Sequence, residues 1–158
     1  MLATRYEAIL NQHQFASFHA GGHNHDNDDD DGKQSHSDFS AKAKKAPLTD
    51  DQLTAQFGEW LSANDVVLFM KGNKKMPRCG FSNYTVQILK FYNVANYKDV
   101  DVLADEAVRE GIKKYSNWPT IPQLYVKGQF VGGCDILKEM HQDGSFEELL
   151  VRENIIKK

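Results

Sequence analysis

The stretch VVLFMKGNKKMPRCGFS, residues 66–82, decides the fold because its pattern changes twice along its length. Residues 66–70 form an uninterrupted apolar run of strand length, which is typical of a β-strand covered on both faces. A loop with Gly72, Pro77 and three basic residues follows at residues 72–78, and from residue 80 to about residue 92 apolar side chains recur at helical spacing. The stretch therefore predicts a buried strand, a loop and a helix in succession.

The segments on either side continue the alternation of helix and strand. Thr49 and Gln52 have the spacing of a capping box and begin a predicted helix at about residues 50–63. The further elements expected are a strand at 97–102, a helix at 104–115, a hairpin of strands at 123–126 and 129–131, and a helical end at 134–141 and 146–150. A strand–helix–strand unit needs a parallel strand pair, whereas a hairpin is antiparallel. The sequence therefore predicts an α/β fold with a small mixed sheet and helices on both faces.

Composition excludes several classes of function. The chain has 158 residues, of which 41% are hydrophobic, enough for the core of one domain. Its formal net charge of −3 argues against nucleic acid or an anionic membrane as a partner, and its longest apolar run is far shorter than the roughly 18 residues of a spanning helix. Two cysteines cannot build the disulfide framework of a small secreted protein. We therefore expect a soluble protein in a reducing compartment.

The N-terminal third differs from the rest of the chain. Residues 1–46 hold five of the six histidines and an Asp-rich run at 26–31, with few aliphatic side chains after the first ten positions. This composition predicts a disordered N-terminal extension at residues 1–46 and a folded domain at residues 47–158.

Two further interpretations of the extension stay open. Residues 1–18 can form a weak amphipathic helix and so a mitochondrial presequence, although transit peptides are Arg-rich and acid-poor and here Glu7 offsets Arg5. Imidazole and carboxylate groups together also suggest metal binding, but a solvated tail is favoured, because disordered ligands must lose chain entropy to converge. The histidines beside the Asp-rich run are His19, His23 and His25.

Cys79 is the first candidate for a reactive residue. It lies where the predicted loop meets the first turn of the predicted helix, where free backbone N–H groups and the helix dipole favour a thiolate. Packing is the alternative, since a lone cysteine is usually buried, but Gly80 and the flanking lysines make a poor core. Four cations that add positive potential precede it within eight residues: Lys71, Lys74, Lys75 and Arg78.

Ser82 stands where a dithiol oxidoreductase would carry its second cysteine. A hydroxyl cannot attack the sulfur of Cys79 to release a mixed disulfide. A two-thiol cycle is therefore excluded unless Cys134 or an external thiol takes the resolving role.

Three motifs together resemble one family. The sequences CGFS at residues 79–82, WPTIP at 118–122 and GGCD at 132–135 are similar to those of monothiol glutaredoxins, specifically the single-domain mitochondrial type, over residues 48–158. The resemblance implies a thioredoxin-like fold with a four-stranded mixed sheet and a location in the mitochondrial matrix. The Asp- and His-rich tract is not part of this resemblance.

The resemblance also implies roles for the charged and apolar groups of the site. Cys79 would be the active thiolate and the protein ligand of a [2Fe-2S] cluster. Lys71 would approach the glycine carboxylate of bound glutathione, and Phe81 would form a wall of the site. Arg109 and Lys113, one helical turn apart, would neutralise the same carboxylate, with surface salt bridging as the alternative.

Backbone groups complete the expected glutathione site. Thr120 and Ile121, before a Pro122 that is cis in this fold, would expose backbone that pairs with the ligand like an added strand. Gly132 and Gly133 would permit close approach of the backbone, and Cys134 with Asp135 would present N–H groups and a carboxylate to the γ-glutamyl end of glutathione.

A [2Fe-2S] cluster usually needs four thiolates, and one chain has only two cysteines. We therefore expect a cluster shared by a homodimer, through two Cys79 thiolates and two molecules of glutathione or a glutathione conjugate, with a monomer when no cluster is bound. A dimer that uses Cys134 as the second ligand is the alternative.

The leading functional hypothesis is a carrier that transfers the cluster to apo iron–sulfur proteins. The rival hypothesis is an enzyme, a monothiol glutathione-dependent oxidoreductase, in which Cys79 attacks glutathionylated proteins. An inert adaptor of the same fold is a third.

Overall fold

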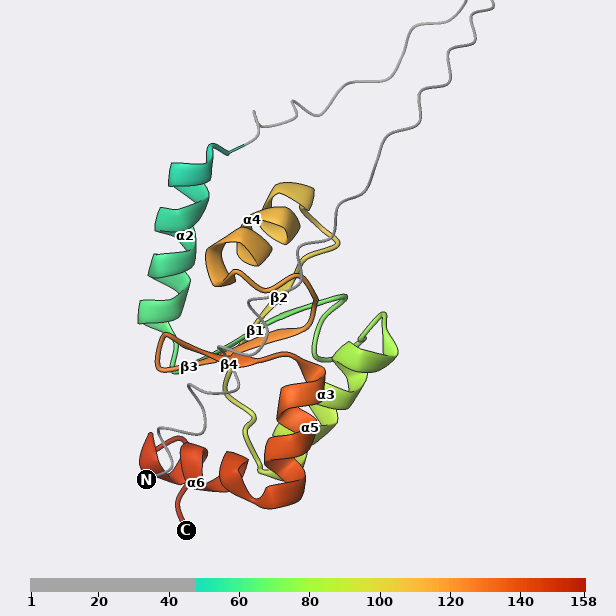
Figure 1. Ribbon diagram of the computed structural model, residues 1–158, viewed down its shortest axis with the longest axis vertical. Coiled ribbons are helices and arrows are strands. Elements are labelled where there is room, and N and C mark those ends of the chain that lie inside the picture. Colours follow the sequence, from blue (N-terminus) through green and yellow to red (C-terminus); the bar gives the residue numbers. More distant parts are fainter. Residues whose placement is uncertain (1–47) are drawn as a thin grey trace, which may run out of the picture. The chain divides into compact units, whose positions relative to one another are not determined.

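The computed structural model describes residues 48–158 (Figure 1). The elements are α2 (Asp50–Ala63), β1 (Val66–Met70), α3 (Gly80–Phe91), β2 (Lys98–Asp101), α4 (Glu106–Ser116), β3 (Gln123–Val126), β4 (Gln129–Gly132), α5 (Cys134–Asp143) and α6 (Ser145–Arg152). The extension predicted at residues 1–46, with its presequence and metal interpretations, lies outside the described residues. The domain boundary at residue 47 stays a prediction.

The four strands form one mixed sheet in the order β2-β1-β3-β4. β1 pairs with β2 in parallel and with β3 in antiparallel, and β3 pairs with β4 in antiparallel. The parallel pair follows from the crossover through α3, and the antiparallel pair from the tight turn between β3 and β4. The predicted mixed sheet of a strand–helix–strand unit and a hairpin is therefore confirmed.

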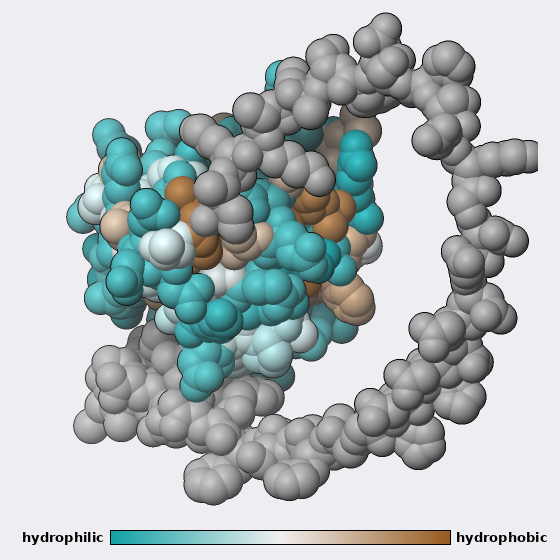
Figure 2. All heavy atoms as spheres, turned by 90° about the horizontal axis from the view of Figure 1, so that it is seen from above, coloured by the Kyte–Doolittle hydropathy of each residue, from teal (hydrophilic) through white to brown (hydrophobic). Residues whose placement is uncertain are grey.

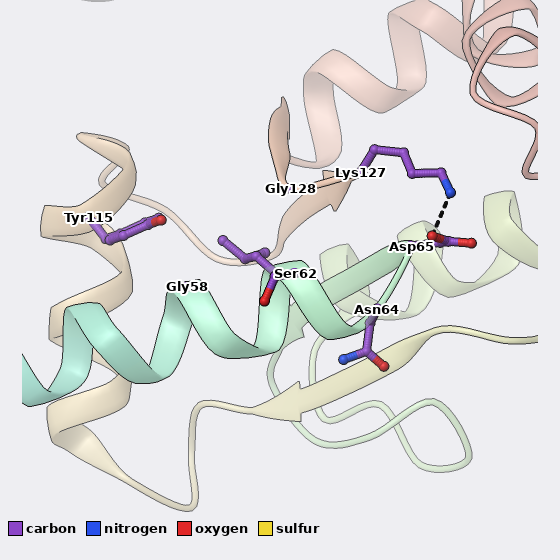
Figure 3. A pocket seen from close by; sticks show the side chains of 8 residues that line it. Gly58, Ser62, Asn64, Asp65, Tyr115, Lys127 and Gly128 are labelled. Atoms are coloured by element: carbon purple, nitrogen blue, oxygen red, sulfur yellow. Dashed lines mark hydrogen bonds and ion pairs between the residues drawn. The ribbon is translucent and has the colours of Figure 1, made fainter.

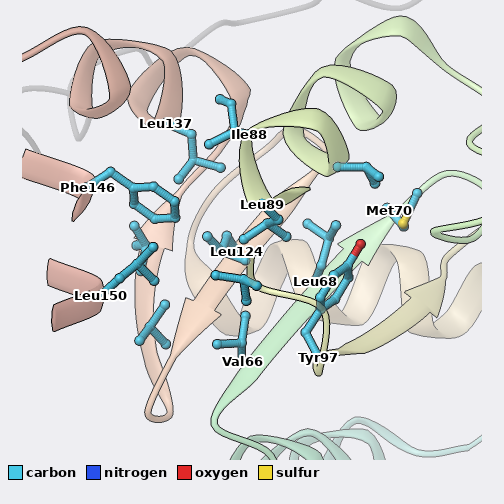
Figure 4. Close-up of a cluster of buried hydrophobic side chains, with 14 residues drawn as sticks. Val66, Leu68, Met70, Ile88, Leu89, Tyr97, Leu124, Leu137, Phe146 and Leu150 are labelled. Atoms are coloured by element: carbon cyan, nitrogen blue, oxygen red, sulfur yellow. The ribbon is translucent and has the colours of Figure 1, made fainter. Parts of the chain in front are cut away.

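β1 is buried along its whole length because both faces of the sheet are covered. Helices α2 and α4 lie on one face, and α3, α5 and α6 lie on the other (Figure 1). Successive side chains of a strand point to opposite faces, so Val66, Leu68 and Met70 join the core of α3, α5 and α6 (Figure 4), whereas Val67 and Phe69 join the core of α2 and α4. The continuous apolar run at 66–70 therefore serves two cores.

Helix boundaries follow from local capping. The predicted capping box of α2 is confirmed, since the Gln52 N–H donates to Thr49 Oγ1 at 3.3 Å and the Thr49 N–H donates to Gln52 Oε1 at 3.0 Å. α4 begins at residue 106 rather than the predicted 104, because the Asp105 carboxylate accepts the N–H of Ala107 at 2.9 Å and so acts as the N-cap. The helical end divides at Gly144, whose φ of 81° interrupts the helix.

Hydrophilic residues predominate on the face drawn in Figure 2, and the hydrophobic ones form separate patches. Within residues 48–158, none of the helices combines the length and the apolar character that crossing a membrane requires.

Candidate functional site

The C-terminal ends of β1 and β4, the N-terminal end of β3 and the first turn of α5 lie together at one end of the sheet. In the strand register, Phe69 of β1 lies opposite Gln123 of β3, and Leu124 of β3 lies opposite Gly132 of β4. The residues that follow β1, precede β3 and follow β4 therefore lie at this same end of the sheet. The segments brought together are Lys71, the WPTIP motif at 118–122 and the GGCD motif at 132–135, the sequence motifs of the predicted site.

The loop between β1 and α3 is fastened to the edge strand β2. The N–H of Gly72 donates to Asp101 Oδ1 at 2.9 Å, and the N–H of Lys74 donates to Asp99 Oδ2 at 2.9 Å. The Lys74 ammonium donates to the carbonyl of Tyr97 at 2.9 Å, so its charge is engaged at β2. These contacts fix the loop that leads to Cys79.

Cys79 is the N-cap residue of α3 and is half-buried, as the sequence predicts for a thiol at a helix start. Burial alone would raise the pKa of the Cys79 thiol, but hydrogen bonds from the backbone and hydroxyl of Ser82 and from the backbone of Phe81, together with the charge of Lys71, outweigh it and lower the pKa. Lys71 is thus the cation, among the four predicted, to which the lowered pKa is traced. The thiolate is the nucleophilic and metal-binding form of cysteine, so this is a reactive sulfur.

Ser82 contributes more than the sequence predicts. Its side chain is fully buried, and its hydroxyl accepts the N–H of Lys71 at 3.1 Å while it donates to the sulfur of Cys79. The hydroxyl that replaces the second thiol therefore links the end of β1 to the thiolate. The sequence could have indicated the contact with Cys79, because Ser82 lies three residues after the N-cap and a side chain at that position can reach the N-cap residue.

Cys134 begins α5 and is half-buried. Burial raises the pKa of the Cys134 thiol, and the negative charges of Asp135 and of a Cys79 thiolate raise it further, against opposing contributions from Thr85 and Lys138. The two cysteines are close enough to influence one another electrostatically, but their environments push their pKa values in opposite directions.

The WPTIP segment enters β3 through a cis peptide bond between Ile121 and Pro122, as the resemblance implies. Thr120 is exposed, Ile121 is half-buried and Pro122 is buried. Beside them, a Cβ added to Gly133 would lie 3.1 Å from Trp118 Nε1 and 3.3 Å from the Pro122 carbonyl oxygen. The glycine therefore lets the start of α5 approach the WPTIP segment closely.

Arg109 and Lys113 lie on α4, with their charges engaged by neighbours on the same helix. Arg109 pairs with Glu106 at 3.0 Å and with Glu110 at 3.3 Å, and Lys113 pairs with Glu110 at 3.0 Å. The hydrogen bond and charge of Lys113, with smaller contributions from Arg109, lower the pKa of Glu110. The surface salt bridging weighed as the alternative is thus present in the ligand-free protein.

Apolar side chains stand exposed beside the thiol. Phe81, two residues after Cys79, is 63% exposed, and Met76 in the preceding loop is 64% exposed. Asp135, one residue after Cys134, is exposed too. Among residues 48–158 no group of three or more His, Cys, Asp or Glu side chains is placed to hold a metal ion.

A hollow of about 380 Å³ lies at the other end of the sheet (Figure 3). It is lined in part by Ser62, Asn64 and Tyr115, with the ion pair of Asp65 and Lys127 at its rim. Asp65 immediately precedes β1, whereas Lys71 immediately follows it. The hollow is therefore separate from the site at Cys79 and contains none of the predicted site residues.

Comparison with known proteins places this chain in a family. Residues 66–131 match the glutaredoxin family model. An uncharacterized ycf64-like monothiol glutaredoxin of Synechocystis is 54% identical over 96 residues, which cover 61% of this chain and 89% of that protein. The zebrafish mitochondrial glutaredoxin-related protein 5 is 54% identical over 97 residues, which cover 61% of this chain and 63% of the relative.

A solved structure agrees with the sequence relatives. The solution structure of reduced apo GrxS14 of poplar is 43% identical and superimposes with a TM-score of 0.60, covering 67% of this chain and 96% of the poplar chain. The thioredoxin-like fold predicted from the motifs is confirmed. Because the match covers 89% of a relative described as a monothiol glutaredoxin, at 54% identity, the chain belongs to the monothiol glutaredoxin family.

Proposed function

We propose that this protein is a glutathione-dependent carrier of [2Fe-2S] clusters, which a homodimer binds through Cys79 and two glutathione thiols and transfers to apo iron–sulfur proteins. The observation that carries the proposal is the Cys79 sulfur: it is half-buried at a helix N-terminus, its pKa is lowered, and no second thiol stands in the CGFS motif. Thiolate sulfur is the protein ligand of iron–sulfur clusters. The sulfur therefore fits the cluster.

Glutathione, or a conjugate of it, is the proposed second ligand because the groups around Cys79 match its chemistry. Lys71 is a half-buried cation at the end of β1, suited to a carboxylate. Thr120 and Ile121 lie just before β3, at the end of the sheet where β1 ends, and backbone outside the strand pairing can pair with an extended peptide. The start of α5, at Cys134 and Asp135, offers N–H groups and a carboxylate to the γ-glutamyl end.

Arg109 and Lys113 of α4 are the further cations that we propose for the glycine carboxylate. Arg109 and Lys113 would bind the glycine carboxylate either through N–H donors that Glu106 and Glu110 do not use or by exchanging these partners for the ligand. Both pairs are exposed enough that such an exchange costs little, since surface ion pairs contribute about 0–1 kcal/mol. Phe81 completes the proposed site as an apolar wall beside the sulfur.

Anaerobic reconstitution of the full chain with iron and sulfide tests the proposal, with and without glutathione, followed by visible absorption and size-exclusion chromatography. A coloured dimer that forms only with glutathione is the expected result. Cys79→Ser should abolish the colour, and the matched control Cys134→Ser should retain it. A colourless monomer in both samples would refute the carrier function, and a coloured dimer without glutathione would make Cys134 the second protein ligand.

A second function is supported by the contrast between the two thiols. In a monothiol oxidoreductase, the Cys79 thiolate would attack a glutathionylated protein, form a disulfide with the glutathione sulfur and release the protein thiolate, which takes up a proton. A second glutathione thiolate would then attack this disulfide, giving glutathione disulfide and restoring the Cys79 thiolate. The lowered pKa of Cys79 suits the first step.

Turnover of a glutathionylated peptide by the full chain measures this activity. Cys79→Ser removes both functions and does not distinguish them. If Cys134→Ser abolishes turnover but retains the cluster, Cys134 is the resolving thiol and the two functions are separable. Unchanged turnover in Cys134→Ser would assign that step to glutathione.

We also propose that the protein acts in the mitochondrial matrix. Support comes from the zebrafish relative, which is described as mitochondrial. Import of the full chain into isolated mitochondria, with protection from added protease, is the expected result, and a chain that stays outside would overturn this location.

A further inference from the structure

Gln123 is a fully buried polar side chain at the first position of β3. Its amide nitrogen donates to the carbonyl of Trp118 at 3.0 Å and to the carbonyl of Thr120 at 3.2 Å. Its amide oxygen accepts the hydroxyl of Tyr125 at 3.4 Å. Both N–H groups of the amide are thus used, and both point back into the segment that precedes the strand.

The surroundings of Gln123 favour an apolar residue. The next three residues of the strand, Leu124, Tyr125 and Val126, are buried in the two cores, and Phe69 lies opposite in β1. Burying an amide is unfavourable unless its hydrogen bonds are made. Because the bonds it makes reach the segment at 118–120, the amide acts on the shape of that segment.

The contacts of Gln123 fix one side of the WPTIP segment. The carbonyls of Trp118 and Thr120 are held inward by the amide, while the side chain of Thr120 remains exposed. At the other end of the segment, the N–H of Trp118 donates to the carbonyl of Lys113 at 3.0 Å. Because the amide of Gln123 engages these two carbonyls, the backbone N–H of Thr120 and the N–H and carbonyl of Ile121 are the groups left to pair with a ligand at this end of the sheet.

We propose that Gln123 is a positioning residue for ligand binding: it does not contact glutathione, but its amide holds the segment 118–121 in the conformation whose backbone pairs with the peptide part of the ligand. The inference rests on the proposed function, because it assumes that this segment binds glutathione. A binding segment that is fixed beforehand loses less conformational freedom when the ligand binds, and this raises affinity. Without the amide, the two carbonyls would need other partners, and the segment would sample other conformations.

The test compares Gln123→Met with wild type in the full chain. Methionine has a similar length and keeps the position apolar, but it donates no hydrogen bond. S-methylglutathione is the probe, because it has no free thiol and cannot form a disulfide with Cys79. We expect its Kd, measured by calorimetry, to rise about tenfold, as loss of preorganised hydrogen bonding would produce. KM for a glutathionylated peptide should rise while kcat and the pKa of Cys79 stay unchanged.

A control on the same strand separates positioning from general destabilisation. Val126→Ala removes buried apolar atoms at the far end of β3 and leaves the contacts of Gln123 intact. It should lower stability without changing the Kd of S-methylglutathione. If Gln123→Met folds and binds the probe with wild-type affinity, or if Val126→Ala weakens binding equally, the positioning role is overturned.

Hydrogen exchange in the ligand-free protein distinguishes this proposal from the proposed function itself. Gln123→Met should speed exchange of the Trp118 amide, which donates to the carbonyl of Lys113 at 3.0 Å, relative to Leu124 in the strand. If wild type does not bind S-methylglutathione, the glutathione function fails. Unchanged exchange at Trp118 in the folded variant would overturn the positioning role independently of that result.

Discussion

Replacing Ser82 by alanine removes the hydroxyl that stands in place of a second thiol. Two hydrogen bonds are lost, the one donated to the Cys79 sulfur and the one accepted from the N–H of Lys71 at 3.1 Å. A hydrogen bond to a charged group contributes about 1.5–3 kcal/mol, and about 1.4 kcal/mol corresponds to a tenfold change in an equilibrium. Because Cys79 is only half-buried, water replaces part of the lost bond, so the lower figure applies. We expect the pKa of Cys79 to rise and its thiolate population, below that pKa, to fall about tenfold.

The assay is a pH titration of thiolate ultraviolet absorbance in a Cys134→Ser background, so that Cys79 is the cysteine observed. Ser62→Ala is the matched control, because its hydroxyl is exposed and donates only to the carbonyl of Glu59. Denaturant unfolding checks the second lost bond, since the N–H of Lys71 is partly buried and a buried donor without its acceptor costs about 1–3 kcal/mol, here the lower end of that range. A folded Ser82→Ala protein whose titration midpoint matches that of the control would refute the role assigned to the hydroxyl.

Three further results are expected. At neutral pH, iodoacetamide should label Cys79 faster than Cys134, because their pKa values are lowered and raised respectively, and mass spectrometry would contradict this if both reacted equally. Gly72→Ala should destabilise the fold and slow labelling of Cys79, because an added Cβ would meet the carbonyl oxygen of Met76 at 2.4 Å at a φ of 82°; thermal unfolding at the wild-type temperature would disprove it. Thr49→Ala should cost about 1 kcal/mol in denaturant unfolding by removing the N-cap of α2, without changing labelling of Cys79.

The sequence predicts the fold well where periodicity and local chemistry agree. The apolar run at 66–70 has one structural solution, a strand with two covered faces, and the Gly-containing turn at 127–128 separates two short strands that can only pair as a hairpin. Boundaries are less predictable where a cap decides them. Asp105 delays the start of α4 from the predicted residue 104 to residue 106, because an N-cap acts through a backbone conformation that periodicity does not report.

The position of the reactive thiol is predictable, but its electrostatics are not. Cys79 lies at a helix start in both the prediction and the structure, since the strand–loop–helix order is a local property. The number of cations nearby is a poor guide, because Lys74 is turned toward Tyr97 and Asp99 of another segment. The hydrogen bond that Ser82 accepts from the N–H of Lys71 is not predictable from local pattern, since it depends on how β1 and α3 meet, and the contacts of Gln123 depend on the fold of the segment before β3.

The single-thiol motif has a consequence for any chemistry at this site. Ser82 keeps the hydrogen bond that a second thiol could give to the Cys79 thiolate, but it cannot attack a disulfide formed there. The thiolate is thus activated without a local means of release. Cys134 is the chain's other thiol, and its raised pKa leaves it mostly protonated at neutral pH, so it is a weak nucleophile there. Both proposed functions therefore need a thiol besides that of Cys79, as a second ligand in one and as the resolving nucleophile in the other, and the Cys134→Ser variant decides whether Cys134 or glutathione supplies it.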